Sequence, residues 1–263
     1  LKWQLSEHWL ARTSLGAGMK MPKLDEIIDS AVLSVSTNTP VEADVRGNPS
    51  LQPERTINYE AVLERYLDGE AGVLGANLYV RSTEDFIERR VQLETTRWVD
   101  RPQNEGRALH WGLELDGKVR MDSYGWKGAT LKSHLTLPNA RVDDVRLGIR
   151  RKARETPKFI WSAGLDAGVP SLKSSYGISL QVSGRSLTEV PGEQQGVTAA
   201  RTTLDAFWLY QMNSDMKLRL TGQNLLRENT VRDMTYTQGS NTWSLHTVDQ
   251  GYRGIMCTLE GRW

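Results

Sequence analysis

The chain has 263 residues, of which 33 are lysine or arginine and 32 are aspartate or glutamate. The resulting net charge of +1 provides no overall field for nucleic acid, so nucleic acid is excluded as the main partner. The single cysteine, Cys257, excludes an internal disulfide framework, and no stretch approaches the roughly 18 apolar residues of a membrane helix. A transmembrane β-barrel is still allowed, because its apolar surface is distributed over alternating strands.

Alternation of apolar and polar residues predicts about eleven strands. In the stretch 56–67, for example, Ile57, Tyr59 and Leu63 share one face, while Asn58 and Glu60 share the other. A short helix is expected after Pro22. In chain order the expected strands are 1–4, 8–18, 56–67, 72–81, 107–121, 129–137, 159–167, 176–185, 202–212, 216–223 and 255–263.

The expected connections alternate between short turns and long loops. Short turns fall near 5–7, 68–71, 122–128, 170–173 and 213–215, and long loops near 19–53, 88–104, 139–156, 187–198 and 227–250. Short turns at one end and long loops at the other are typical of outer-membrane barrels. In the alternative, a soluble sandwich, the apolar parity would form the core.

The two parities favour the barrel. The polar parity is rich in glycine, serine and opposite charges, which suits a lumen. The apolar parity carries aromatic residues near strand ends, as interfacial girdles do. These are Trp9, Trp111, Trp161, Trp208 and Trp263.

No group of residues predicts catalysis, a metal site or a cofactor. The four histidines lack metal-ligand spacing. Glu114 and Asp116 share a strand face with Lys118 and Arg120, so neutralised lumen charges explain them better than acid–base chemistry. The basic run 146–154 is expected to be a solvated loop, although it has the charge to attract lipopolysaccharide phosphates.

Several stretches resemble a known family. Gly47–Glu60, GNPSLQPERTINYE, looks like the pattern G-N-P-x-L-x-P-E-x-x-x-N-Y-E, matched at nearly every fixed position. Arg12–Pro22, Asn104–Glu114 and Leu218–Leu226 look like weaker motifs in the same order. Together they resemble the C-terminal half of the β-barrel of TonB-dependent outer-membrane receptors.

The resemblance implies an all-β, antiparallel transmembrane barrel in the bacterial outer membrane. Residues 1–263 would supply about eleven C-terminal strands of a likely 22-stranded barrel, without its plug domain. An open half-barrel has unpaired edges that lipid cannot satisfy, so the chain is expected to be a fragment. The intact receptor would use TonB, reached through the absent plug segment, to import a scarce small molecule such as an iron–siderophore complex or a cobalamin-like ligand.

The resemblance also places ligand contacts in the long loops and on the upper lumen wall. Seven residues are the candidates: Arg81, His110, Arg185, Arg201, Asp205, Tyr236 and Trp243. Outer-membrane lipid and lipopolysaccharide are the other expected partners. The alternatives are a passive porin, an outer-membrane enzyme and a soluble β-rich binding module.

Overall fold

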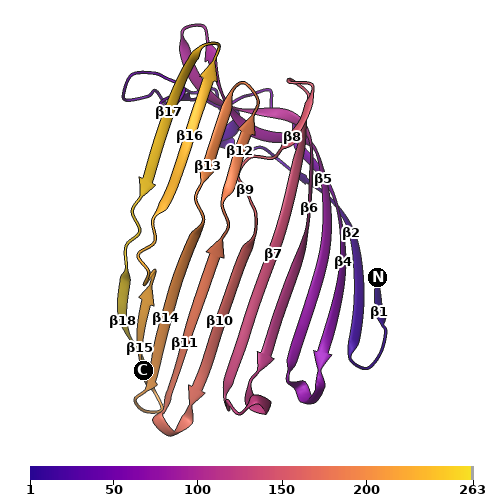
Figure 1. Cartoon of the computed structure of the whole chain (residues 1–263), viewed down its shortest axis with the longest axis vertical. Coiled ribbons are helices and arrows are strands. Elements are labelled where there is room, and N and C mark those ends of the chain that lie inside the picture. The colour runs from indigo at the N-terminus through magenta and orange to yellow at the C-terminus, as the bar shows by residue number, and fades with distance from the viewer. Residues whose placement is uncertain (262–263) are drawn as a thin grey trace.

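The computed structural model describes residues 1–261, so the expected girdle residue Trp263 lies outside the described residues. A curved antiparallel sheet dominates the chain (Figure 1), and eleven strands follow one another along it, as the alternation predicts. These strands are β1 (Lys2–Gln4), β2 (Trp9–Lys20), β4 (Glu54–Leu67), β5 (Gly72–Glu94), β6 (Arg97–Arg120), β7 (Ala129–Asp144), β10 (Ile160–Val169), β11 (Ser174–Ser183), β14 (Arg201–Gln211), β15 (Met216–Gln223) and β18 (Gly254–Gly261).

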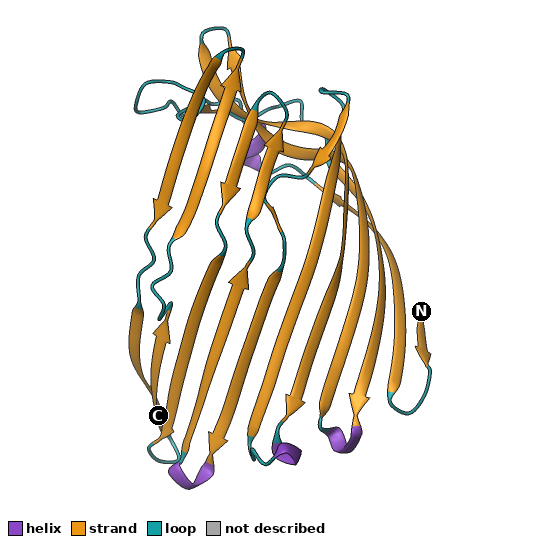
Figure 2. Cartoon of the chain, viewed as in Figure 1, coloured by secondary structure: helices purple, strands orange, loops and turns teal. Residues whose placement is uncertain are grey.

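Shorter elements complete the fold. β3 (Asp44–Val45) pairs in parallel with β6, and β8 (Ile149–Lys152) pairs with β7. A second sheet has the order β17-β16-β13-β12-β9. Its members are β9 (Thr156–Pro157), β12 (Ser186–Val190), β13 (Gln194–Thr198), β16 (Thr230–Gln238) and β17 (Asn241–Asp249). The helix after Pro22 is confirmed as α1 (Leu24–Ile27), and η1 (Asp68–Glu70), η2 (Asp122–Tyr124) and η3 (Pro170–Leu172) form tight turns at the lower end of the main sheet (Figure 2).

The main sheet has one apolar and one polar face. We call the outer face the one that carries Ile57, Leu78 and Ile178, all of which are exposed although they are large and apolar. We call the inner face the one that carries Glu60 and Tyr79, which line a common hollow. The register between neighbouring strands places outward apolar residues opposite one another and inward polar residues opposite one another. An apolar parity that is exposed rather than covered contradicts the core that a soluble sandwich would build from it.

The expected long loops at 88–104, 187–198 and 227–250 are wrong, because these stretches are mostly strand. β5 and β6 continue as a paired hairpin to Glu94 and Arg97. The β12–β13 and β16–β17 hairpins occupy most of the other two stretches. The loop expected at 139–156 is also partly strand, since β7 runs to Asp144 and β8 pairs back onto it.

A bulge bends the β5–β6 hairpin. The register shifts between Thr83 and Phe86, and Asp85 adopts a left-handed φ of 55°. On the partner strand Gly106 has φ +124°, and a Cβ there would lie 2.3 Å from the Asp143 carbonyl oxygen, so only glycine fits. Beyond this point residues 84–107, which we call the crossing hairpin, bend over the top of the sheet (Figure 1).

The segment 21–53 fastens the tip of the crossing hairpin. Asp44 is buried and accepts two hydrogen bonds from the Arg97 guanidinium, at 2.5 and 2.7 Å. The backbone N–H of Ser34 donates to the same carboxylate, and Asn38 binds the backbone of Trp98 in both directions. The Arg97 hydrogen bonds, followed by that of Ser34, lower the pKa of Asp44 from its ordinary value to about 2.

Asp44→Asn is therefore expected to loosen the segment 21–53 at neutral pH. A depressed carboxyl pKa stabilises the folded state above the unfolded pKa of roughly 3.9, and this contribution is lost as the pH falls through about 2. In pepsin digestion of the intact protein, Asp44→Asn should be cleaved in this segment faster than wild type at pH 4. The two rates should converge as the pH approaches 2.

The control is Asp25→Asn in α1, which removes an exposed carboxylate that makes no ion pair among residues 1–261. It should be cleaved at the wild-type rate throughout. Equal rates for wild type and Asp44→Asn at pH 4 would show that the Arg97 contact does not hold the segment.

Candidate functional site

A large hollow lies on the inner face, where β2, β4, β5 and β6 run side by side. Its volume is about 700 Å³. Register places Arg81 opposite His110, and the Phe86 ring meets the His110 ring edge to face at 5.6 Å. Below them Asn77 donates to Glu114 at 2.9 Å. The hollow is polar because inward residues of adjacent strands meet there, and it can accept hydrogen bonds from a ligand or donate to one.

A second hollow of about 370 Å³ lies between β11, β14 and the end of β15. Arg201 and Asp205 both line it, together with Gln181 and Asn224. The backbone N–H of Asn224 donates to the Asp205 carboxylate at 2.7 Å, which fixes that side chain. The Arg201 guanidinium has no such partner among the ion pairs of residues 1–261, so it is available to an anionic group.

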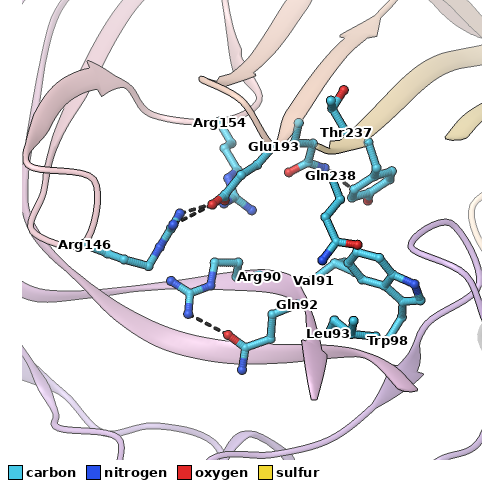
Figure 3. A pocket seen from close by; sticks show the side chains of 12 residues that line it. Arg90, Val91, Gln92, Leu93, Trp98, Arg146, Arg154, Glu193, Thr237 and Gln238 are labelled. Carbon is cyan, nitrogen blue, oxygen red and sulfur yellow. Dashed lines mark hydrogen bonds and ion pairs between the residues drawn. The ribbon is translucent and has the colours of Figure 1, made fainter. Parts of the chain in front are cut away.

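A third hollow, of about 210 Å³, lies under the crossing hairpin (Figure 3). Arg90 and Trp98 enter it from the hairpin, and Tyr236 enters it from β16. Trp98 also meets Trp243 of β17 edge to face at 5.5 Å. The crossing hairpin therefore contacts strands of the second sheet that are distant from it in the sequence. We call this hollow the mouth pocket.

The arginines of the mouth pocket are paired with carboxylates. Arg146 and Glu193 form a bidentate pair with distances of 2.5 and 2.7 Å, which joins the β7–β8 turn to the β12–β13 turn (Figure 3). Arg90 lies 3.5 Å from the buried Glu105. Burial raises the pKa of Glu105, and Arg90 opposes that shift.

A buried ionic cluster lies next to the mouth pocket and shares Arg154 with it. Arg151 on β8 donates to Asp144 at 2.9 Å and to Glu88 at 2.6 Å, and Arg154 lies 3.5 Å from Glu88. Only 3% of the Arg151 side chain is exposed, and none of Asp144. Burial pushes the pKa of Asp144 upward, but the Leu147 backbone N–H and Arg151 outweigh it and hold that pKa below its ordinary value.

The basic run 146–154 is therefore not the solvated loop that its composition suggests. Arg146, Arg151 and Arg154 each have a carboxylate partner, and Arg151 is buried. The sequence carries no clear signal for this cluster. Glu88 lies within Phe86-Ile87-Glu88-Arg89-Arg90, which does not alternate although it is part of β5.

The structure brings six of the seven candidate residues into three groups. Arg81 and His110 share the large inner hollow, Arg201 and Asp205 share the second, and Tyr236 of the mouth pocket pairs with Trp243 in β-sheet register. Arg185 joins none of these groups. It lines a separate hollow beside Lys152 and Lys158.

Within residues 1–261 no helix is long and apolar enough to cross a membrane. The same residues contain no group of three or more histidine, cysteine, aspartate or glutamate side chains that could hold a metal ion.

The sequence of the main sheet from β1 to β15 decides the family. The family model described as TonB dependent receptor-like, beta-barrel matches residues 1–225. The chain belongs to this family of receptor barrels. The match spans every strand from β1 to β15, so the family's barrel is the architecture to which the eleven-stranded sheet corresponds. No curated protein sequence matches the chain significantly.

Solved receptor barrels share the fold. A ferric enterobactin receptor mutant of Pseudomonas aeruginosa (PfeA), in complex with enterobactin, superposes on 99% of this chain with a TM-score of 0.68 and 16% identity. The FrpB iron transporter of Neisseria meningitidis covers 99% with a TM-score of 0.64 and 16% identity. The siderophore receptor PirA of Acinetobacter baumannii covers 87% with a TM-score of 0.60 and 13% identity. The chain spans only 39%, 37% and 36% of those three chains, respectively.

Proposed function

We propose that residues 1–263 are the C-terminal part of the barrel of an outer-membrane receptor that imports an iron–siderophore complex with energy supplied through TonB. The observation that carries this proposal is the family match over residues 1–225, on a sheet whose outer face is apolar and whose inner face is polar. An iron chelate is favoured over a cobalamin-like ligand because the similar solved structures are named as siderophore receptors and an iron transporter.

The described residues suit transport rather than catalysis. The inner hollows contain isolated hydrogen-bonding groups and paired charges, which suit binding and release of a polar ligand. We place the ligand contacts at the mouth pocket with Tyr236 and Trp243, then on the inner wall at Arg81 and His110, and at Arg201 and Asp205. A plug and further strands that complete the barrel belong to the same proposal. TonB would act through that plug.

Uptake in living cells tests the proposal. Cells that make the full-length protein should accumulate radioactive iron from a ferric siderophore, and disruption of TonB should abolish the accumulation. Uptake that persists without TonB would instead support the passive porin. Recovery of the protein in the soluble fraction would support a soluble β-rich module.

The proposed inner wall can be tested in the same assay. Arg81→Ala and Arg201→Ala are each expected to lower uptake about tenfold at subsaturating ligand, since a hydrogen bond to a charged group contributes about 1.5–3 kcal/mol. Arg55→Ala is the control, because Arg55 is an exposed arginine on the outward parity of β4, three residues from Asn58, which pairs with Arg81. Loss of uptake in all three variants would show an effect of charge or folding rather than of ligand contact.

A further inference from the structure

The main sheet splits above the last paired residues of β7 and β10, Thr136 and Ile160. Beyond that pair β7 pairs with β8, with Arg141 opposite Lys152, while β9 pairs with β12, with Thr156 opposite Leu187. A hollow of about 190 Å³ lies between the two pairs. We call it the split hollow.

Three cations line the split hollow, and no carboxylate does. Lys152 enters it from β8, Lys158 follows β9, and Arg185 precedes β12. The other lining residues are Pro138, Asn139, Ala140, Ala153, Thr156, Pro157 and Leu187, which carry no charge. None of the three cations takes part in an ion pair among residues 1–261, although Arg150 and Arg151 beside them are paired. The hollow therefore has a net charge of about +3, with every cation available.

The backbone forces two of these cations together. The backbone N–H of Lys158 donates to the Arg185 carbonyl at 3.2 Å, and the backbone N–H of Gly184 donates to the Phe159 carbonyl at 2.8 Å. Like charges on directly paired strands repel, so this arrangement favours an anion that neutralises them. Lysine offers a point charge and arginine a planar fork, and both suit phosphate oxygens.

The split hollow opens toward the outer face. Lys152 lies opposite Arg141, and Arg141 shares the outward parity of β7 with Leu137 and Asn139. The Arg141 guanidinium lies over the ring of Trp111, 5.6 Å from its centre, and makes no ion pair in the described chain. Leu137 is exposed on the outer face, and Asn139 is two residues, or about 7 Å, further along the strand. The cations therefore lie just above the exposed apolar surface.

We propose that the split hollow binds a phosphate of an outer-leaflet glycolipid through Lys152, Lys158 and Arg185. This inference rests on the proposed function, because it takes the outer face to be embedded in the outer membrane. The position favours a lipid over a free anion. A lipid phosphate at this height places its acyl chains against the apolar surface below, whereas a soluble phosphate gains nothing from that surface.

Native mass spectrometry of the detergent-purified full-length protein tests the site, with diphosphoryl lipid A as the probe. Replacing the three cations together, Lys152→Gln, Lys158→Gln and Arg185→Gln, is expected to weaken binding at least about tenfold. The control replaces three exposed lysines near the opposite end of the sheet, Lys127→Gln, Lys173→Gln and Lys217→Gln. It removes the same charge, and it should keep the wild-type affinity within about twofold.

Three results would overturn the proposal. The first is an equal loss of affinity in the control, which would mean that only the net charge matters. The second is equal wild-type affinity for the lipid after enzymatic removal of its phosphates. The third is complete displacement of the lipid by inorganic phosphate at about its own concentration, which would indicate a soluble-anion site. Fractionation of the same cells separates the two levels of failure, since absence of wild type from the outer membrane contradicts the proposed function itself.

Discussion

Arg151→Met is expected to lower the free energy of unfolding by about 3–5 kcal/mol, because it leaves the buried Asp144 without its cation and leaves Glu88 with only Arg154, 3.5 Å away. The Arg151 guanidinium is the one group that contacts both Asp144 and Glu88. The matched change is Arg150→Met at the adjacent position. Arg150 is 61% exposed and pairs with the exposed Asp143, so its loss should cost less than about 1 kcal/mol. Denaturant titration of the full-length protein, followed by tryptophan fluorescence, measures both.

A rescue experiment separates uncompensated charge from lost packing. Adding Asp144→Asn and Glu88→Gln to Arg151→Met removes both carboxylate charges and should restore most of the lost stability. If the triple variant were as unstable as Arg151→Met alone, the guanidinium would act mainly by filling space. If Arg151→Met matched Arg150→Met, the cluster would not stabilise the fold at all.

Ile178→Arg should cost about 2–4 kcal/mol in a bilayer, whereas Ser179→Arg should cost less than about 1 kcal/mol. The two residues are neighbours on β11 and point to opposite faces. Ile178 pairs with Leu165 and Ala206 on the outer face, whereas Ser179 lies beside Asp205 on the inner face. Ile178 is about 13 Å along the strand from the short turn, near the middle of an apolar band of about 25 Å.

Reversible folding into lipid vesicles measures this difference, with urea titration of each variant. The comparison also separates the barrel from a soluble module. Ile178 is 46% exposed, and on a water-facing surface an arginine at that position would be tolerated. Equal stability of the two variants in vesicles would therefore contradict a lipid-facing outer surface.

The crossing hairpin shows where prediction from the sequence failed. Residues 84–107 are dense in arginine and glutamate, and such a composition normally indicates a solvated loop. Here the bulge at Asp85 turns the hairpin over the sheet, and Glu105 becomes buried beside Arg90. Burial of a charge depends on partners that arrive from other strands, and alternation within one strand contains no information about them.

The same reason applies to Arg185. The sequence predicts that Arg185 lies near the loop end of its strand with the other ligand candidates. Periodicity does not predict which residues of other strands surround it. Its surroundings depend on the break between β11 and β12 and on the divergence of β7 from β10. Those are properties of pairing between strands, and they bring Arg185 to Lys152 and Lys158 instead.

The sequence by itself determined the number of main strands, their two parities and the family. Alternation has a period of two, so it reports which residues share a face without any knowledge of neighbours. Ile57 and Leu78 are outward, and Glu60 and Tyr79 inward, as that period requires. Only the tertiary structure decided how far the strands extend, that the crossing hairpin bends over the top of the sheet, and which charges are paired or free. These depend on bulges, hairpin register and contacts between distant residues, whose energies arise only once the chain is folded.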